Sequence, residues 1–307
     1  MFVNNSTSGD LLQLPKVRYD DAGTERVVFT LPPTDAPERD SILIFALPKS
    51  GSVLLNAIMR DLSSEVGLRY VSIMREYFVL GIPDELHPAD TAGIFLPKGY
   101  CYGGFRNMPG FQIPVLPIVK KILLVRDPRD MLVSHYYSML NSHPSRGAAL
   151  ATSRPDISVN QLAKQVSIDE YVRQIAPAYR KYFEGYKALC TDYSFDAFLP
   201  SSGYSWFSRL ATKLKDRERR IRVYRYEDVI YVKERWIRDI CDWFGILVSR
   251  QFKVKLAQKH DKLPPIERVD KHIRQVHPGN YHSKLSPDTV VFLNKYFFDD
   301  MKFFGYI

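Results

Sequence analysis

The sequence predicts an α/β fold in which a central, mainly parallel sheet is flanked by helices on both sides. Two short apolar runs rich in branched residues, SILIFAL at 41–47 and KKILLV at 120–125, have the composition of strands buried on both faces. Each is followed by a segment with apolar residues three and four positions apart, as in a helix. Strands that alternate with helices imply a parallel sheet covered on both sides.

The other expected elements follow the same reasoning along the chain. RYVSIMR at 69–75 is expected to form a second strand, and RIRVYRYED at 220–228 a later one. Helices are expected over 167–189 and 204–216, and over KERWIRDICDWFG, where Gly245 ends the helix. TVVFLNKYFFDDMKFFG at 289–305 is expected to be the last amphipathic helix.

The chain is expected to contain one domain, because it has no internal repeat and no long linker. Residues 1–40 are polar and proline-rich apart from ERVVFTL, and are expected to form an extended N-terminal arm or an edge feature. The domain proper is expected to span 41–307. Within it, 262–286 has prolines, histidines and a glycine but little periodicity, so this segment is a candidate lid.

Composition excludes several classes of protein. A chain of 307 residues with 45% hydrophobic residues can bury a large core, so it is neither disordered nor fibrous. Cys101, Cys190 and Cys241 are too few and too scattered for a disulfide framework or a zinc cluster, and we expect reduced, packed thiols. No histidine pair has metal-ligand spacing on a helix, so no metal site is expected. Because no apolar run approaches the ~20 residues of a membrane helix, we expect a soluble, cytoplasmic protein.

The charge balance indicates an anionic partner. With 43 Lys and Arg against 34 Asp and Glu, the formal net charge is 43 − 34 = +9. Both nucleic acid and a phosphorylated cofactor would suit this charge. Acidic residues interrupt the densest basic run, KLKDRERRIRVYRYED at 213–228, which favours a solvated helix end leading into a strand over a nucleic-acid-binding stripe.

The loop after the first predicted strand has the composition of a phosphate-binding loop. Lys49 supplies a positive charge, Ser50 and Ser52 supply hydroxyl donors, and Gly51 lets the backbone approach an anion at the start of a helix. An ordinary strand-to-helix turn with an exposed lysine is the alternative. The loop is not a Walker A motif, because Lys49 precedes its only glycine.

Two of these segments resemble the sulfotransferases that use 3′-phosphoadenosine 5′-phosphosulfate (PAPS). ALPKSGSVLLNAIM resembles their PKSGTTW loop, and LLVRDPRDMLVSHYYS resembles their strand that ends in Arg and leads to a helix carrying Ser eight residues later. The resemblance implies a P-loop-like sulfotransferase architecture in which Arg126 and Ser134 hold the 3′-phosphate. It also implies cofactor contacts from Lys49, Ser50, Gly51, Ser52, Val53 and Leu54. Arg129 and Asp130 are expected to be a surface pair at the helix start.

Further resemblances lie nearer the C-terminus. RQVHPGNY resembles the family's cofactor lid, RKGxxGDW, with Arg274 and Gly279 in register, which implies that Arg274 is a second cation on the 3′-phosphate. YRYEDV resembles the family's YED strand end, whose role is mainly structural. Phe207 of SWFSRL stands where the family has an aromatic residue that stacks on adenine, although a core phenylalanine is an equal alternative.

The implied reaction is transfer of the sulfuryl group of PAPS to a hydroxyl or amine of a small-molecule or sugar acceptor, by in-line displacement and without a metal. Lys49 is expected to neutralise the charge that develops on the leaving phosphate oxygen, and Ser134 to restrain that lysine. Two alternatives remain. A P-loop kinase would need a Walker A lysine and an acidic magnesium ligand, and a basic nucleic-acid-binding protein would show strong salt dependence. The resemblance disfavours a nucleic-acid partner and leaves the oligomeric state undetermined.

The acceptor base is the least determined part of the site. The family's histidine on a KxHLP strand has no counterpart in KGYCYGGFRNMP. Other branches use a glutamate, and Glu76 in MREYFVLGI is the predicted base, at the end of the second strand, where burial beside Tyr77 and Phe78 would raise its pKa. A surface glutamate paired with Arg75 is the alternative. The rivals are histidines: His87, His135, His272 and His277.

Acceptor contacts are predicted with less support from the sequence. Tyr102 and Arg106 lie on the strand that lacks the histidine and are expected to face the acceptor pocket, and His277 lies on the candidate lid. His135 follows Ser134 directly on a helix and so points about 100° away from it, which favours a packing role. The sequence does not identify the acceptor.

Overall fold

A six-stranded sheet runs through the part of the chain that the computed structural model describes, which is residues 14–21, 23–141, 157–192, 195–197, 221–261, 263 and 276–307. Every strand pairing in this sheet is parallel, and the spatial order is β4-β5-β3-β6-β8-β7. The strands are β3 (Ile42–Ala46), β4 (Arg69–Val71), β5 (Tyr100–Phe105), β6 (Lys120–Val125), β7 (Phe195–Ala197) and β8 (Ile221–Arg225). The predicted α/β fold with a parallel sheet is therefore confirmed.

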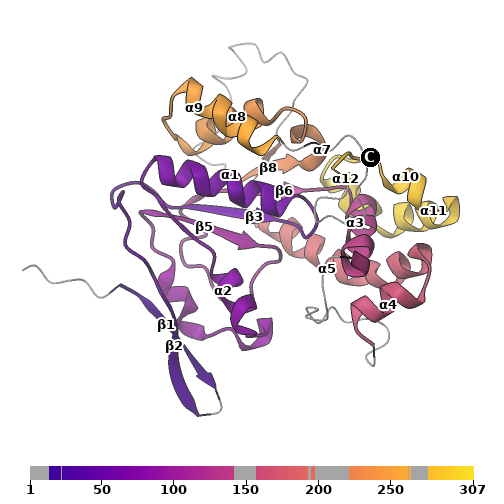
Figure 1. Cartoon of the computed structure of the whole chain (residues 1–307), viewed down its shortest axis with the longest axis horizontal. Helices are drawn as coiled ribbons and strands as arrows, with labels where there is room; N and C mark the ends of the chain where they lie inside the picture. The colour runs from indigo at the N-terminus through magenta and orange to yellow at the C-terminus, as the bar shows by residue number, and fades with distance from the viewer. Residues whose placement is uncertain are drawn as a thin grey trace, which may run out of the picture.

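Helices cover both faces of the sheet (Figure 1). One face packs against α1 (Ser52–Glu65), α8 (Lys233–Phe244) and α9 (Arg250–His260), and the other against α2 (Ile73–Leu80), α3 (Pro128–Asn141) and α5 (Ile168–Asp192). The shorter segments are η1 (Asp84–Leu86), η2 (Ala89–Ile94), α4 (Val159–Gln165), α7 (Tyr226–Val229), α10 (Tyr281–Lys284), α11 (Pro287–Tyr296) and α12 (Phe298–Phe303). Among the described helices α5 is the longest, with 25 residues, and none combines the length and apolar character needed to span a bilayer.

Strand β3 shows why the two faces have separate cores. All five of its residues are buried, and alternate side chains point to opposite faces of a strand. Leu43 and Phe45 pack in the cluster under α5, whereas Ile42 and Ile44 pack in the cluster under α1 and α8. A strand that is apolar on both faces is typical of the centre of a parallel sheet.

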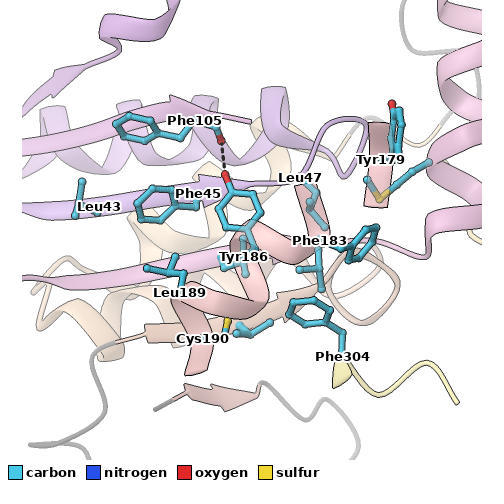
Figure 2. Packing of buried hydrophobic residues seen from close by; sticks show 14 of the residues in the cluster. Leu43, Phe45, Leu47, Phe105, Tyr179, Phe183, Tyr186, Leu189, Cys190 and Phe304 are labelled. Carbon is cyan, nitrogen blue, oxygen red and sulfur yellow. Dashed lines mark hydrogen bonds between the residues drawn. The ribbon is translucent and has the colours of Figure 1, made fainter. Parts of the chain in front are cut away.

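Aromatic side chains dominate the core between the sheet and α5. Figure 2 shows Phe45 of β3 and Phe105 of β5 next to Tyr186 of α5. The ring centroids of Phe45 and Tyr186 are 5.9 Å apart in an edge-on arrangement, and the Tyr186 hydroxyl donates to the Phe105 carbonyl over 3.4 Å. This contact fixes the carboxyl end of β5 against α5.

The N-terminal region forms a hairpin. All of ERVVFTL except Leu31 lies in β2 (Thr24–Thr30), which pairs antiparallel with β1 (Lys16–Asp21), a strand not predicted from the sequence. Val17 and Leu31 have no exposed surface and belong to the core cluster of the main sheet. The Arg18 amide also donates to the carboxylate of Asp90 in η2. The hairpin is therefore packed on the main body.

Three of the expected elements differ from the structure. The strand expected over 220–228 ends at Arg225, and Tyr226–Val229 forms α7. The second strand ends at Val71, and α2 begins at Ile73, because Ile73 and Tyr77 have helical spacing and Gly81 ends the helix in the left-handed conformation. The C-terminal helix is divided into α11 and α12 at Phe297. The expected helix at 204–216 and most of the candidate lid (262 and 264–275) lie outside the described residues, as do Phe207, His272 and Arg274.

All three cysteines are free and buried, as predicted. Burial raises the pKa of the Cys101 and Cys190 thiols to about 12 and that of Cys241 to about 11. They act as small apolar side chains in the two cores.

Candidate active site

The candidate site lies at the carboxyl edge of the sheet, where β3, β6 and β8 end. The chain goes from β3 to β4 and β5 on one side and then crosses to β6 on the other, so the strand order reverses beside β3. Ligands of open α/β sheets bind outside the carboxyl ends of strands at such a switch point. The loop after β3 and Arg126 after β6 meet there, since the Arg126 guanidinium donates to the Lys49 carbonyl over 3.3 Å.

The loop between β3 and α1 has an unusual backbone. Lys49 has φ 61° and is the one non-glycine residue with positive φ in the described part of the chain, and Gly51 has φ 93°. Gly51 is the N-cap of α1, and no side chain caps this helix end. The first amides of α1, those of Ser52, Val53 and Leu54, therefore lack partners within the helix and suit an anion.

Gly51 is required here for contact as well as for conformation. A Cβ atom at this position would lie 3.0 Å from two ring carbons of Tyr226, which is closer than most Cβ contacts in proteins. A left-handed conformation at a residue other than glycine also costs about 1–2 kcal/mol. The Tyr226 ring therefore limits how closely the loop between β3 and α1 can approach the end of β8.

The two serines of the loop do different things. The Ser50 hydroxyl is buried and donates to the carbonyls of Leu47 (2.6 Å) and Leu124 (3.1 Å), which joins the loop to β6. Ser50 thus joins the loop to β6 in this conformation, and its contact with the cofactor stays a prediction. The Ser52 hydroxyl has no hydrogen-bond partner among the described residues, so it is free to bind an anion.

Arg126 is the cation that the structure prepares most clearly for a ligand. Arg126 is 5% exposed. Its guanidinium lies 4.4 Å from the centroid of the Tyr226 ring and 3.6 Å from the Asp130 carboxylate. The buried Nε has no hydrogen-bond partner among the described residues. Burying a guanidinium N–H without a partner is unfavourable, whereas a phosphate would satisfy it.

Asp130 is a buried anchor. Its side chain is fully buried and accepts hydrogen bonds from the amides of Gly279 (2.7 Å) and Tyr281 (3.0 Å). Arg129 is buried too, where it forks onto Asp127 and donates to Asn294 over 2.8 Å. The predicted surface pair of Arg129 and Asp130 is therefore wrong. No spacing in the sequence indicates the contact, because Asp130 and Gly279 are 149 positions apart.

Tyr226 links three parts of the site. Its ring contacts Gly51 and Arg126, and its hydroxyl donates to the Val276 carbonyl over 2.7 Å. The neighbouring Glu227 accepts from the Asp127 amide (3.0 Å) and from the Tyr306 hydroxyl (2.9 Å), and burial raises the pKa of its carboxyl group. The structural role of the YED segment is thus visible, although no pattern in the sequence distinguishes Tyr226.

Ser134 lies on α3 one helical turn after Asp130, so both side chains are on the same helix face. It is partly exposed, and its hydroxyl makes no hydrogen bond to another described residue. His135, by contrast, is buried, and its Nδ1 is 2.9 Å from the Tyr171 hydroxyl of α5. His135 therefore fills the interface between α3 and α5, and Ser134 is available to a ligand.

Glu76 lies in the first turn of α2 and not at the end of a strand. It is half-buried beside Tyr77, which is buried, but Phe78 is 65% exposed and does not cover it. No ion pair joins Glu76 to Arg75 in the described structure. Because α2 starts two residues after β4, Glu76 is close to the same carboxyl edge as the phosphate loop, on the side of β4 and β5.

The predicted acceptor contacts Tyr102, Arg106 and His277 differ in their exposure to solvent. Tyr102 is a core residue, 1% exposed, whose hydroxyl donates to the Ile94 carbonyl (2.7 Å) and accepts from the Leu96 amide (2.8 Å), so it offers no polar group to an acceptor. Arg106 is exposed, directly after β5. His277 is partly exposed, with Nδ1 2.7 Å from the Tyr231 hydroxyl.

A metal centre is not evident in the described ranges, which contain no group of three or more His, Cys, Asp or Glu side chains that could hold an ion. Lys49 and Arg126 bring positive charge to the site, and the start of α1 adds a partial positive charge. This arrangement suits a ligand with several phosphate or sulfate oxygens.

Comparison with known proteins gives a family and a fold. The mouse sulfotransferase SULT7A1 complexed with PAP has a TM-score of 0.54 at 15% identity, covering 85% of this chain and 84% of that one. Retinol dehydratase in complex with retinol and PAP has a TM-score of 0.52 at 16% identity, with 87% and 82% covered. The same enzyme with androsterone and inactive cofactor PAP gives 0.53 at 15%, with 85% and 80% covered.

At 15–16% identity, the TM-scores and coverage of these three structures show a common fold alone. Comparison with curated protein sequences gives no match. The family model described as "Sulfotransferase domain" matches residues 113–305, which is 305 − 113 + 1 = 193 of the 307 residues. The chain therefore belongs to the sulfotransferase domain family.

Proposed function

We propose that this protein is a PAPS-dependent sulfotransferase that transfers a sulfuryl group to a hydroxyl or amine of a small-molecule or sugar acceptor. The observation that carries the proposal is the buried, unpartnered Nε of Arg126 beside the left-handed phosphate loop. Family membership supports the reaction class, and the PAP in the similar structures supports the donor.

The residues present fit a donor with phosphates at both ends of a ribose. The amides at the start of α1, together with Lys49 and Ser52, suit the 5′ side, and Arg126 with Ser134 suits the 3′-phosphate. Gly279 would contribute to the donor site through the conformation of its backbone and not through its amide, because that amide donates to Asp130. Arg274 and Phe207 remain predicted contacts to the 3′-phosphate and to adenine.

When bound, PAPS supplies an electrophilic sulfur whose leaving group is a phosphate. Lys49 would stabilise the negative charge that develops on the bridging oxygen, and this stabilisation is largest in the transition state. Glu76 would accept the proton of the acceptor hydroxyl. Both residues belong to loops or helices that start at the carboxyl edge of the sheet. Retinol and androsterone in the similar structures favour a hydrophobic small-molecule acceptor.

Calorimetric titration with adenosine 3′,5′-bisphosphate, beside ADP and ATP with magnesium, tests the donor. Micromolar or tighter binding that needs the 3′-phosphate is the expected result. Arg126→Gln should weaken binding at least tenfold, because it removes a charge-assisted contact. Arg222→Gln is the matched control, since Arg222 lies within β8 and its guanidinium is bonded to Asp239. If only ATP with magnesium bound, the proposed function would be wrong and the kinase alternative would take its place.

Glu76→Gln tests the base. Turnover with PAPS and an accepted alcohol should fall at least a hundredfold while affinity for the bisphosphate stays unchanged. Glu65→Gln, at the exposed end of α1, is the matched control and should keep normal turnover. Wild-type turnover in Glu76→Gln would remove Glu76 from the mechanism.

A further inference from the structure

His87 is a buried imidazole whose ring nitrogens make no hydrogen bond to any described residue. It lies between η1 and η2, and its side chain is 3% exposed. Its ring stacks on Tyr77 of α2, with centroids 4.5 Å apart, and lies 5.7 Å from Phe111. Both ring nitrogens are inaccessible to solvent, and neither has a hydrogen-bond partner among the described residues. This combination is unusual for a folded protein.

Packing does not explain a histidine at this position. A neutral imidazole carries one N–H donor and one lone pair, and burial without partners costs free energy for each. An apolar side chain of similar size would fill the space between Tyr77 and Phe111 without this cost. Buried polar groups that are left unsatisfied call for a functional explanation, and a ligand that supplies the missing partner is the simplest one.

The residues around His87 connect it to the acceptor side of the site, beside β4 and β5. Nε2 is 3.5 Å from Asp84 Oδ1, which is too long for a hydrogen bond but close enough to favour the tautomer with the proton on Nε2. The other Asp84 oxygen accepts from the Asn107 side chain over 3.1 Å. Asn107 follows Arg106 directly after β5, at the carboxyl edge where β4 and β5 end.

The chemistry of the ring is that of a hydrogen-bond acceptor. Burial lowers the pKa of His87 below its ordinary value of 6.5, against the opposing effect of Asp84 and Glu85 from η1. From α2 the facing group is Tyr77, whose own pKa is raised by burial to about 12, so that it stays uncharged. A neutral imidazole with its proton on Nε2 offers the Nδ1 lone pair to an O–H or N–H donor.

We infer that His87 is the polar contact of an acceptor subsite, in which Nδ1 accepts a hydrogen bond from a hydroxyl or amine of a ring-bearing acceptor. Aromatic side chains form the apolar wall of this subsite: Tyr77, Phe95 and Phe111. The ligand is therefore an aromatic or alicyclic alcohol or amine. The inference deepens the proposed function and rests on it for the identity of the second substrate.

The test uses 2-naphthol and its methyl ether, 2-methoxynaphthalene, which differ in the hydrogen that His87 would bind. Each is titrated calorimetrically into the protein with and without adenosine 3′,5′-bisphosphate. His87→Leu should weaken 2-naphthol binding about tenfold and leave the ether unchanged, because a single hydrogen bond is lost. His87→Asn, which keeps a polar group near the Nδ1 position, should recover most of the affinity.

The matched control is His260→Leu. His260 lies on α9, on the other side of the sheet, with Nε2 2.8 Å from an oxygen of Asp61. This variant should bind both probes as the wild type does. A second readout does not depend on any variant folding. In wild-type protein with ¹⁵N-labelled histidine, 2-naphthol should shift the Nδ1 resonance of His87 and the ether should not.

Three results would overturn the inference: unchanged 2-naphthol affinity in His87→Leu, equal losses for both probes, or no response of His87 Nδ1 to 2-naphthol in the wild type. The bisphosphate titration separates this failure from failure of the proposed function. Bisphosphate binding with no role for His87 would contradict the subsite alone. A naphthol response at His87 without bisphosphate binding would contradict the donor.

Discussion

The carboxyl edge of the sheet has two regions that are held together in different ways. Beside β3, β6 and β8, hydrogen bonds and ring contacts join the phosphate loop, Arg126, Asp130 and Tyr226 to the segment that starts at Val276. Beside β4 and β5, aromatic packing dominates, and His87 is buried without a hydrogen-bond partner among the described residues. The first region is shaped before a ligand arrives, whereas the second has a polar group that a ligand must satisfy.

This difference matches the demands of two substrates. A donor with fixed phosphates is bound best by amides and cations already in place, because preorganised groups lose little entropy on binding. An apolar wall with one polar contact can accept a range of ring compounds and still orient a hydroxyl. The following predictions test whether the two regions are as distinct as their contacts indicate.

The largest effect is expected from Gly51→Ala in the donor region. The new Cβ would be 3.0 Å from the Tyr226 ring, and its left-handed backbone would be strained by about 1–2 kcal/mol. We expect bisphosphate affinity to fall at least tenfold, with a lower melting temperature, measured by calorimetry and thermal unfolding.

Gly245→Ala is the control for strain alone. Gly245 has φ 68° at the end of α8, and nothing lies within 4 Å of a Cβ built there. It should lower stability by about 1–2 kcal/mol and leave bisphosphate affinity unchanged. Equal affinity losses in both variants would show that the contact with Tyr226 is unimportant.

Tyr102→Phe should destabilise the protein without weakening acceptor binding. Loss of the hydroxyl leaves the Ile94 carbonyl and the Leu96 amide without a partner, which costs about 1–3 kcal/mol. Denaturant unfolding measures this loss, and the 2-naphthol titration measures acceptor affinity. A variant that is stable but binds 2-naphthol poorly would return Tyr102 to the acceptor contacts.

Tyr226→Phe should have a smaller effect on stability, of about 1 kcal/mol, because a single hydrogen bond to Val276 is lost while the ring remains. Bisphosphate affinity should fall by less than tenfold, since the contacts of the ring with Gly51 and Arg126 persist. A loss as large as that of Gly51→Ala would show that the hydroxyl, rather than the ring, organises the donor region.

The smallest effect is a change in the pH dependence of stability caused by His87. Because burial lowers its pKa in the folded state, the unfolded chain takes up a proton below about pH 6.5 that the folded protein does not. Stability should therefore fall as the pH decreases below that value, and His87→Leu should lose part of this dependence. Melting temperatures at pH 7.5 and 5.5 measure it, and parallel pH profiles of the two proteins would contradict a neutral buried His87.

The donor region could be predicted from the sequence to a large extent, because its signals are local. Apolar strand runs followed by helical spacing place Lys49, Gly51 and Arg126 at strand ends, and parallel strands bring those ends to one edge. The segment YRYEDV likewise predicts a strand end beside them. The sequence could not show that Tyr226 fixes Gly51, since that contact joins positions far apart in the chain.

The acceptor region could not be predicted as well, since burial decides the roles there. RYVSIMR has branched and aromatic residues that favour a strand, but Ile73, Tyr77 and Gly81 set a helix, which places Glu76 on α2. The sequence does not distinguish the roles of Tyr102 and His87, because both are aromatic side chains with polar atoms. The structure separates them, because backbone groups hydrogen-bond to the Tyr102 hydroxyl, whereas His87 has no hydrogen-bond partner in the described part of the chain.

The three buried thiols make the native chain a convenient background for chemical labelling. Maleimides and alkyl halides react with thiolates, and the raised pKa values of Cys101, Cys190 and Cys241 keep these groups protonated and shielded at neutral pH. A cysteine introduced at Phe78, on the exposed side of α2, would then be modified selectively. A fluorophore attached there would report on the acceptor region without any native residue of the core being replaced.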